Sequence, residues 1–158
     1  MKSDYQSIVT IVSLAFKAGG EIMKLYNQKI KTELKDDLSP VTQADRLSDK
    51  IIVTGLNKEF SKIQCISEES YSKVKIKSLN DIFFLVDPLD GTKEFIEKNN
   101  EFTVNIALIN RNKPELGVIY APAKNKIFFT DDNNKAYELE VENYHNEINL
   151  NRSKRISV

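Results

Sequence analysis

Hydrophobic residues in the first sixty positions recur every three or four residues, which is the period of a helix that buries one face. The pattern predicts a helix over about Asp4–Asn27, in which Gly19-Gly20 marks either close packing or a local weakness. It predicts a second helix over about Thr42–Phe60, with Thr42 as the N-cap. The polar stretch between the helices, which includes Lys35–Pro40, is interpreted as a loop.

Beyond residue 60 the pattern changes to short apolar runs separated by turn residues, which is typical of strands. Residues 111–114 and 131–134 are rich in turn formers and are interpreted as hairpin turns. The expected strands span 63–67, 82–86, 102–109, 116–120, 127–130 and 136–141, and residues 148–158 are expected to begin another. We therefore expect an α+β fold, with two N-terminal helices packed on a largely antiparallel sheet, in one domain over residues 1–158.

Charge and composition exclude several classes of function. Lys and Arg together number 23, as do Asp and Glu, so no overall basic field attracts nucleic acid or an anionic membrane. The single cysteine, Cys65, excludes an internal disulfide and fits a buried strand thiol. No apolar run approaches the roughly twenty residues that span a bilayer. With no signal peptide expected, we expect a cytoplasmic protein, with peripheral association at the inner face of the membrane as an alternative.

Two carboxylates are expected within one turn, where the apolar strand over 82–86 ends. Asp87 and Asp90 are separated by Pro88, which has no N–H to donate to a sheet, and by Leu89. Mg²⁺ prefers carboxylate and carbonyl oxygens, so both acids and the Leu89 carbonyl are candidate ligands. The same spacing is also good turn chemistry, in which the two acids cap the turn and the next helix.

The turn continues into a candidate phosphate site. Gly91 offers a positive φ, and Thr92 is expected to start a short helix whose first N–H groups attract an anion. Lys93 is a candidate charge partner for the substrate phosphate, with a solvated lysine at a helix start as the alternative.

Two further acids lie earlier in the chain. Glu68 follows the expected strand over 63–67, and it reaches the same ion if that strand lies beside the strand that ends at Asp87. The alternative interpretation is that Glu68 lies in a solvated acidic loop and binds no ion. Asp45 lies in the first turn of the second expected helix, where the helix dipole favours a carboxylate. Its functional interpretation is a base or a group that orients water.

Three segments in this order and spacing resemble the inositol monophosphatase superfamily. They read Lys-x-Asp-x-Ser-Pro-Val-Thr-x-Ala-Asp over 35–45, Ser-Glu-Glu-Ser over 67–70 and Val-Asp-Pro-Leu-Asp-Gly-Thr-Lys-Glu-Phe over 86–95. Lys93-Glu94-Phe95 stands where inositol monophosphatases typically carry Thr-Asn-Phe, so the match is to the CysQ-type 3'(2'),5'-bisphosphate nucleotidases. The resemblance continues through 100–109 and 117–122 and covers the chain from about Ile8 onward.

The resemblance implies a layered α/β fold of the inositol monophosphatase type and a phosphatase activity. The implied reaction releases the 3'-phosphate of 3'-phosphoadenosine 5'-phosphate to give AMP, within sulfur assimilation and nucleotide recycling. The related 3'-phosphoadenylyl sulfate is also a substrate of the family. Mg²⁺ is the implied cofactor and a small nucleotide the implied partner, while nucleic acid is not expected.

The resemblance also assigns the metal ligands. Glu68, Asp87 and the Leu89 carbonyl are expected to hold one Mg²⁺, and Asp87 to bridge to a second ion shared with Asp90.

By the same resemblance Thr92, with Glu68 or Asp45 behind it, orients the attacking water. The backbone of Leu89, Asp90, Gly91 and Thr92 is expected to hold the substrate phosphate.

The superfamily has a second, C-terminal half, in which a Trp-Asp motif completes the second metal site and the base pocket is formed. This sequence has no tryptophan, and residues 151–155 resemble the segment where that half begins. We therefore expect the C-terminal half to be absent and the apolar surface it covers to favour association. Two alternatives are an inositol-phosphate or sugar-phosphate phosphatase of the same superfamily, and an inactive remnant that binds only metal or phosphate.

Overall fold

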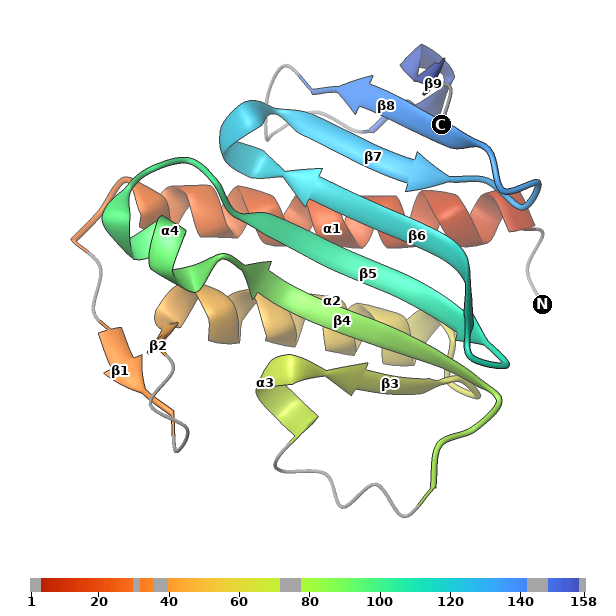
Figure 1. Ribbon diagram of the computed structural model, residues 1–158, viewed down its shortest axis with the longest axis horizontal. Coiled ribbons are helices and arrows are strands. Elements are labelled where there is room, and N and C mark those ends of the chain that lie inside the picture. The colour runs from red at the N-terminus through yellow and green to blue at the C-terminus, as the bar shows by residue number, and fades with distance from the viewer. Residues whose placement is uncertain (1–3, 30–31, 36–39, 72–77, 142–147, 157–158) are drawn as a thin grey trace.

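Two long helices lie on one face of a seven-stranded sheet (Figure 1). The computed structural model describes residues 4–29, 32–35, 40–71, 78–141 and 148–156. The helices are α1 (Asp4–Tyr26) and α2 (Gln43–Glu59). The strands, in both chain order and sheet order, are β3 (Gln64–Ser67), β4 (Ile82–Asp90), β5 (Thr103–Asn110), β6 (Lys113–Ala121), β7 (Lys126–Thr130), β8 (Ala136–Glu140) and β9 (Lys154–Ile156).

The expected α+β fold and the largely antiparallel sheet are confirmed. Among the described strands of this sheet, β3 and β4 pair in parallel, and every later pair, from β4–β5 to β8–β9, is antiparallel. Short helices follow two of the strands: α3 (Glu68–Tyr71) after β3, and α4 (Thr92–Glu97) after β4. Two 3-10 turns, η1 (Pro122–Lys124) and η2 (Leu150–Arg152), precede β7 and β9.

Alternation along the strands builds a core on the helical side only. On β4 and β6, Phe84 and Val118 are buried beneath the helices, whereas Leu85 and Ile119 point to the other face and are 48% and 49% exposed. Among the described residues no helix covers this second face (Figure 1). The sheet is therefore apolar on both sides but packed on one. None of the described helices is both long enough and apolar enough to span a lipid bilayer.

Helix α1 runs without interruption through Gly19-Gly20. The first of these glycines lies against Tyr120 of β6, since a Cβ built on Gly19 would stand 2.3 Å from the ring carbon Cε1. Phe16, one turn earlier, packs against the same ring, with centroids 5.8 Å apart. Close packing is therefore the correct interpretation at Gly19, and a weakness in the helix is not.

Part of the segment interpreted as a loop between the helices forms a small hairpin instead. Strands β1 (Thr32–Leu34) and β2 (Pro40–Thr42) pair in antiparallel fashion, with Thr32 opposite Thr42. All three side chains of β1 are exposed, so this strand has no burial pattern for a sequence to reveal. Residues 36–39 of the first family motif lie outside the described part of the chain.

Two boundaries also differ from expectation. Strand β6 begins at Lys113, three residues before the expected apolar run over 116–120, because Arg111 and Asn112 alone make the turn, with positive φ values of 48° and 63°. In the segment expected to begin a last strand, residues 150–152 form η2 before β9 starts at Lys154.

Candidate functional site

The parallel pairing of β3 and β4 brings two of the expected metal ligands to the same edge of the sheet. Ser67, the last residue of β3, lies opposite Val86 of β4. Glu68 and Asp87 are the residues that follow this last pair, so both acids lie where the parallel pairing of the two strands ends. The condition set by the sequence, that the two strands lie side by side, is confirmed.

A bulge in β4 presents Asp90 close to Asp87. Asp87 pairs with Asn105 of β5 and Asp90 pairs with Thr103, so β4 contains one extra residue over this stretch. Pro88 lies inside the bulge, where its missing N–H breaks no ladder bond. The strand therefore continues to Asp90, whereas the sequence predicted that it ends at Asp87.

The backbone of the bulge is tied to the helical layer. Ser48 of α2 is fully buried, and its hydroxyl donates to the carbonyl of Pro88 at 2.7 Å. Leu89 is 3% exposed and packs into the core, which fixes the backbone between the two aspartates. The site is thus anchored to both layers of the fold.

Asp87 is held in an environment that disfavours its charge. Burial, together with the nearby negative charges of Glu68 and Asp90, raises the pKa of Asp87 to about 7. Its Oδ1 is buried and accepts no hydrogen bond from any described residue. A cation bound to Asp87 would offset the negative charge of this carboxylate and its neighbours, and it would give Oδ1 a partner.

Glu68 carries its own counter-ion. Lys35, which follows β1, contacts Glu68 at 2.8 Å and Glu69 at 2.5 Å. Partial burial acts to lower the pKa of Lys35, but its hydrogen bonds to the two glutamates outweigh burial and raise it. In Glu69 the balance is reversed, since burial raises its pKa despite the attraction of Lys35.

The backbone around Glu68 is fixed by a carboxylate of α2. Asp49 accepts hydrogen bonds from Ser67 at 2.5 Å and from Ser70 at 2.8 Å, one residue before and two residues after Glu68. Through these two bonds, Asp49 connects the residue before α3 to the third residue of α3. Asp49 therefore positions Glu68.

Asp45 is both a helix cap and a partner of Thr92. It is 1% exposed, and its Oδ2 accepts hydrogen bonds from the Thr42 N–H at 2.8 Å and the Thr42 hydroxyl at 2.6 Å. Together with the Ala44 N–H donating to Thr42, these bonds form a capping box at the start of α2. The other oxygen, Oδ1, accepts from the Thr92 hydroxyl at 2.9 Å. The predicted N-cap is confirmed, and the carboxylate behind Thr92 is that of Asp45.

Gly91 joins the acid-bearing bulge to α4. Its φ of 91° lies in the left-handed region, and a Cβ there would stand 2.7 Å from the carbonyl oxygen of Glu101. The expected positive φ and the helix beginning at Thr92 are confirmed. Lys93 is exposed and makes no ion pair within the described part of the chain, so its role as a phosphate partner stays a prediction.

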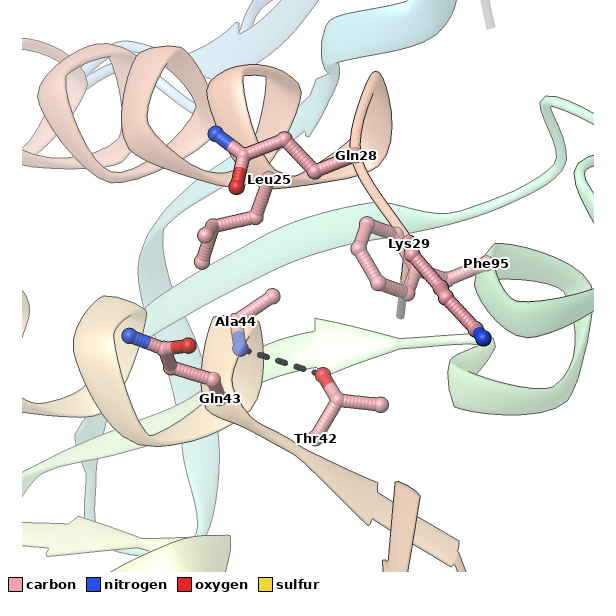
Figure 2. A pocket seen from close by; sticks show the side chains of 7 residues that line it. All are labelled: Leu25, Gln28, Lys29, Thr42, Gln43, Ala44 and Phe95. Carbon is pink, nitrogen blue, oxygen red and sulfur yellow. Dashed lines mark hydrogen bonds between the residues drawn. The ribbon is translucent and has the colours of Figure 1, made fainter. Parts of the chain in front are cut away.

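A small pocket lies beside the capping box (Figure 2). It is formed where the end of α1 (Leu25), the residues that follow it (Gln28 and Lys29), the start of α2 and Phe95 of α4 converge. It opens next to Thr42 and is not lined by the acids of the sheet edge.

The acids have the chemistry that a hard divalent cation requires. Three carboxylates and the Leu89 carbonyl supply oxygen ligands only, and Asp87 Oδ1 lacks a donor. Searched over the described ranges, however, no three acidic, histidine or cysteine side chains are grouped so that they could hold a metal ion. In this structure Glu68 is bound to Lys35, and Asp90 accepts a hydrogen bond from Asn105.

The fold and this edge define the chain as a member of the inositol monophosphatase family, whose family model matches residues 4–157. Among individual relatives, the chain is 49% identical to the 3'(2'),5'-bisphosphate nucleotidase CysQ of Buchnera aphidicola over 114 residues. That match covers 71% of this chain and 43% of the relative. The chain spans about half the length, or less, of the curated relatives it matches.

Solved structures show the same fold. The crystal structure of CysQ from Bacteroides thetaiotaomicron, a bacterial member of the inositol monophosphatase family, matches with a TM-score of 0.76 and 34% identity. The match covers 99% of this chain and 59% of that one. An IMPase/NADP phosphatase complexed with Mg²⁺ and phosphate matches with a TM-score of 0.71 and 19% identity, over 84% of this chain and 51% of that one. The second likeness concerns the fold alone.

Three residues of the site were not assigned from the sequence: Lys35, Asp49 and Asn105. Lys35 opens the first family motif, which was a usable signal. Asp49 lies between polar residues inside α2, and Asn105 lies between Val104 and Ile106 on β5. Nothing in either local sequence shows what these side chains contact, which only the packing of the elements reveals.

Proposed function

We propose that the chain carries the metal and phosphate site of a Mg²⁺-dependent 3'(2'),5'-bisphosphate nucleotidase. The proposed reaction converts 3'-phosphoadenosine 5'-phosphate to AMP and phosphate. The observation that supports it best is that Glu68 and Asp87 both lie where the parallel pairing of β3 and β4 ends, while the buried Asp45 carboxylate accepts a hydrogen bond from Thr92 of the same turn as Asp90. The identity to nucleotidases named CysQ favours a bisphosphate nucleotide over an inositol phosphate.

The proposed metal ligands are Glu68, Asp87, Asp90 and the Leu89 carbonyl. Magnesium, when bound, supplies positive charge for the phosphoryl group and makes water more acidic. The IMPase/NADP phosphatase, which has the same fold, is complexed with Mg²⁺ and phosphate, and this supports Mg²⁺ as the proposed cofactor. Asp87 is the clearest candidate ligand of the four, because its buried Oδ1 accepts no hydrogen bond from any described residue.

Thr92 is proposed to orient the attacking water. Its hydroxyl lies within hydrogen-bond distance of two acceptors, Asp45 Oδ1 at 2.9 Å and the Leu89 carbonyl at 3.3 Å. Donation of its one proton to the nearer acceptor, Asp45, leaves the oxygen lone pairs to accept a hydrogen bond from water. Asp45 is held in place by Thr42 and does not need to move. The backbone from Leu89 through Gly91 to Thr92 is the proposed phosphate cradle, with Lys93 as a charge partner.

The test is phosphate release from 3'-phosphoadenosine 5'-phosphate, inositol 1-phosphate and fructose 1,6-bisphosphate, each with Mg²⁺ and with a chelator. The proposal expects Mg²⁺-dependent turnover of the nucleotide that Thr92→Val abolishes. The control is Thr10→Val, which removes a hydroxyl bonded within α1 far along the chain. Preference for either sugar phosphate would favour a different phosphatase of the same superfamily. Mg²⁺ binding without turnover would favour a binding module.

We also propose that these residues form the N-terminal α+β half of the family fold. The support is the coverage of about half of each relative, together with the exposed apolar face around Leu85 and Ile119. A role in sulfur assimilation in the cytoplasm follows from the proposed substrate. Complementation of a bacterial strain that lacks its own CysQ tests this role, with Thr92→Val as the negative control.

A further inference from the structure

Asn105 makes a single side-chain hydrogen bond within the described part of the chain, and that bond reaches the proposed metal site. It lies on β5, directly opposite Asp87 on β4. Its Nδ2 donates to Asp90 Oδ2 at 3.0 Å. The Asn105 side chain thus contacts Asp90, while its backbone pairs with Asp87.

The side-chain oxygen of Asn105 accepts no hydrogen bond from the described residues. Asn105 Oδ1 is buried and accepts no hydrogen bond from a described residue, and the same is true of Asp87 Oδ1. On the other side of Asn105, the paired residue of β6 is Ile119, whose side chain has no N–H or O–H to offer. Asp87 and Asn105, which pair across β4 and β5, therefore each have a buried acceptor oxygen to which no described residue donates. Buried acceptors are rarely left in this way unless a cation or a water satisfies them.

An amide suits this position better than an acid or an aliphatic residue. Asparagine donates through nitrogen and accepts through oxygen, so it holds Asp90 with one atom and presents an uncharged oxygen with the other. Amide oxygens belong to the ligand set of hard divalent cations and of the water molecules around them. Because the amide is neutral, it adds no repulsion to a site where Glu68 and Asp90 already disfavour the charge of Asp87.

We propose that Asn105 is a positioning residue of the divalent-cation site. Its Nδ2 orients Asp90, and its Oδ1 accepts from the hydration shell of the ion bound at Asp87. This inference rests on the proposed function, since it assumes that the acids of the bulge bind a divalent cation. It adds a residue from a third strand to that site.

The experiment measures Mg²⁺ binding to the purified chain by isothermal titration calorimetry and by the rise in Tm on adding Mg²⁺, without any substrate. Asn105→Leu keeps the size of the side chain and removes both its donor and its acceptor. Loss of partners that orient metal ligands typically weakens binding 10–100-fold, so we expect a loss of at least about tenfold. The Tm of the metal-free variant should be unchanged or higher, because a buried acceptor without a partner has been removed.

Asn110→Leu is the matched control. Asn110 lies on the same strand and donates through its amide to a carboxylate, that of Glu115, at 3.2 Å, but at the opposite end of β5. This variant should bind Mg²⁺ like the parent chain. Asn105→Asp is the second test. It restores an oxygen but not a donor to Asp90, so Mg²⁺ affinity should depend more steeply on pH than in the parent.

The outcomes separate the two proposals. If the parent chain does not bind Mg²⁺, the proposed function fails and the inference falls with it. If the parent binds and Asn105→Leu binds equally well, only the inference is overturned. It is also overturned if Asn110→Leu loses as much affinity, or if metal-free Asn105→Leu loses Tm without losing affinity for Mg²⁺.

Discussion

Replacing Asp87 with asparagine should stabilise the metal-free chain at neutral and alkaline pH. Burial and the charges of Glu68 and Asp90 raise the pKa of Asp87 to about 7, far above the value of 3.8 for an unperturbed aspartate. The folded chain therefore binds this proton more tightly than the unfolded chain does, and stability falls as the pH rises from about 4 through 7. Asparagine has almost the same shape and never ionises.

The size of the effect follows from the same values. A change from 3.8 to about 7 gives a ceiling of about 4 kcal/mol, at 1.36 kcal/mol for each pH unit. Asp87 is only partly buried, and solvent screening reduces this ceiling to about 1–2 kcal/mol. For a domain of this length, each kcal/mol shifts the Tm by about 2–4 °C. We therefore expect Asp87→Asn to raise the Tm by about 2–8 °C at pH 8 and by almost nothing at pH 4.

The assay is thermal unfolding by circular dichroism from pH 4 to pH 8, with EDTA and then with Mg²⁺. In EDTA the difference in Tm should grow with pH, and in Mg²⁺ it should shrink or change sign, because the variant has lost a ligand. Asp131→Asn is the control with the opposite sign. Slight burial opposes the shift, but hydrogen bonds from the Lys135 N–H and the Tyr137 hydroxyl lower the pKa of Asp131, so its replacement should lower the Tm at pH 8. A pH-independent gain in Asp87→Asn would refute the electrostatic explanation.

Three further substitutions test the residues that surround the proposed metal ligands. Gly91→Ala should destabilise the chain by about 2 kcal/mol, because it combines a left-handed backbone with a clash, whereas Gly117→Ala has room and should cost less; chemical denaturation compares them. Lys35→Met should raise the affinity for Mg²⁺ several-fold at low salt in calorimetry, because the ion no longer competes with an ammonium for Glu68; an unchanged or weaker affinity would contradict this. Asp49→Ala should cost about 1–2 kcal/mol and weaken Mg²⁺ binding, since it removes the acceptor of two hydroxyls, and stability loss with intact binding would argue against a positioning role.

The elements that the sequence predicted well are those whose burial has a clear period. Helices α1 and α2 and strands β5 and β7 follow the apolar pattern to within one or two residues. The hairpin of β1 and β2 was missed because β1 is exposed at every position and is stabilised by pairing alone. The parallel pairing of β3 with β4 leaves no mark in either apolar run, so the sequence could state it only as a condition.

The acids of the site were predictable, but their partners were not. Glu68, Asp87 and Asp90 stand out in the sequence as carboxylates at the ends of strands and turns. Lys35 contacts an acid 33 positions away, and Asn105 contacts one 15 positions away across the bulge. The Asn105 contact depends on strand register and on the extra residue in β4, neither of which is encoded in local composition. The Lys35 contact depends on how the segment after β1 lies against the start of α3.

Asp45 shows why the two interpretations offered by the sequence, a helix cap or a catalytic group, did not need to compete. A carboxylate has two oxygens, and here Oδ2 serves the capping box while Oδ1 accepts from Thr92. The cap fixes the orientation of the carboxylate, and that orientation fixes the Thr92 hydroxyl. Loss of turnover in Asp45→Ala would therefore mix a weakened α2 with a misplaced Thr92. Thr92→Val removes only the second function, so it is the substitution that separates chemistry from folding at this site.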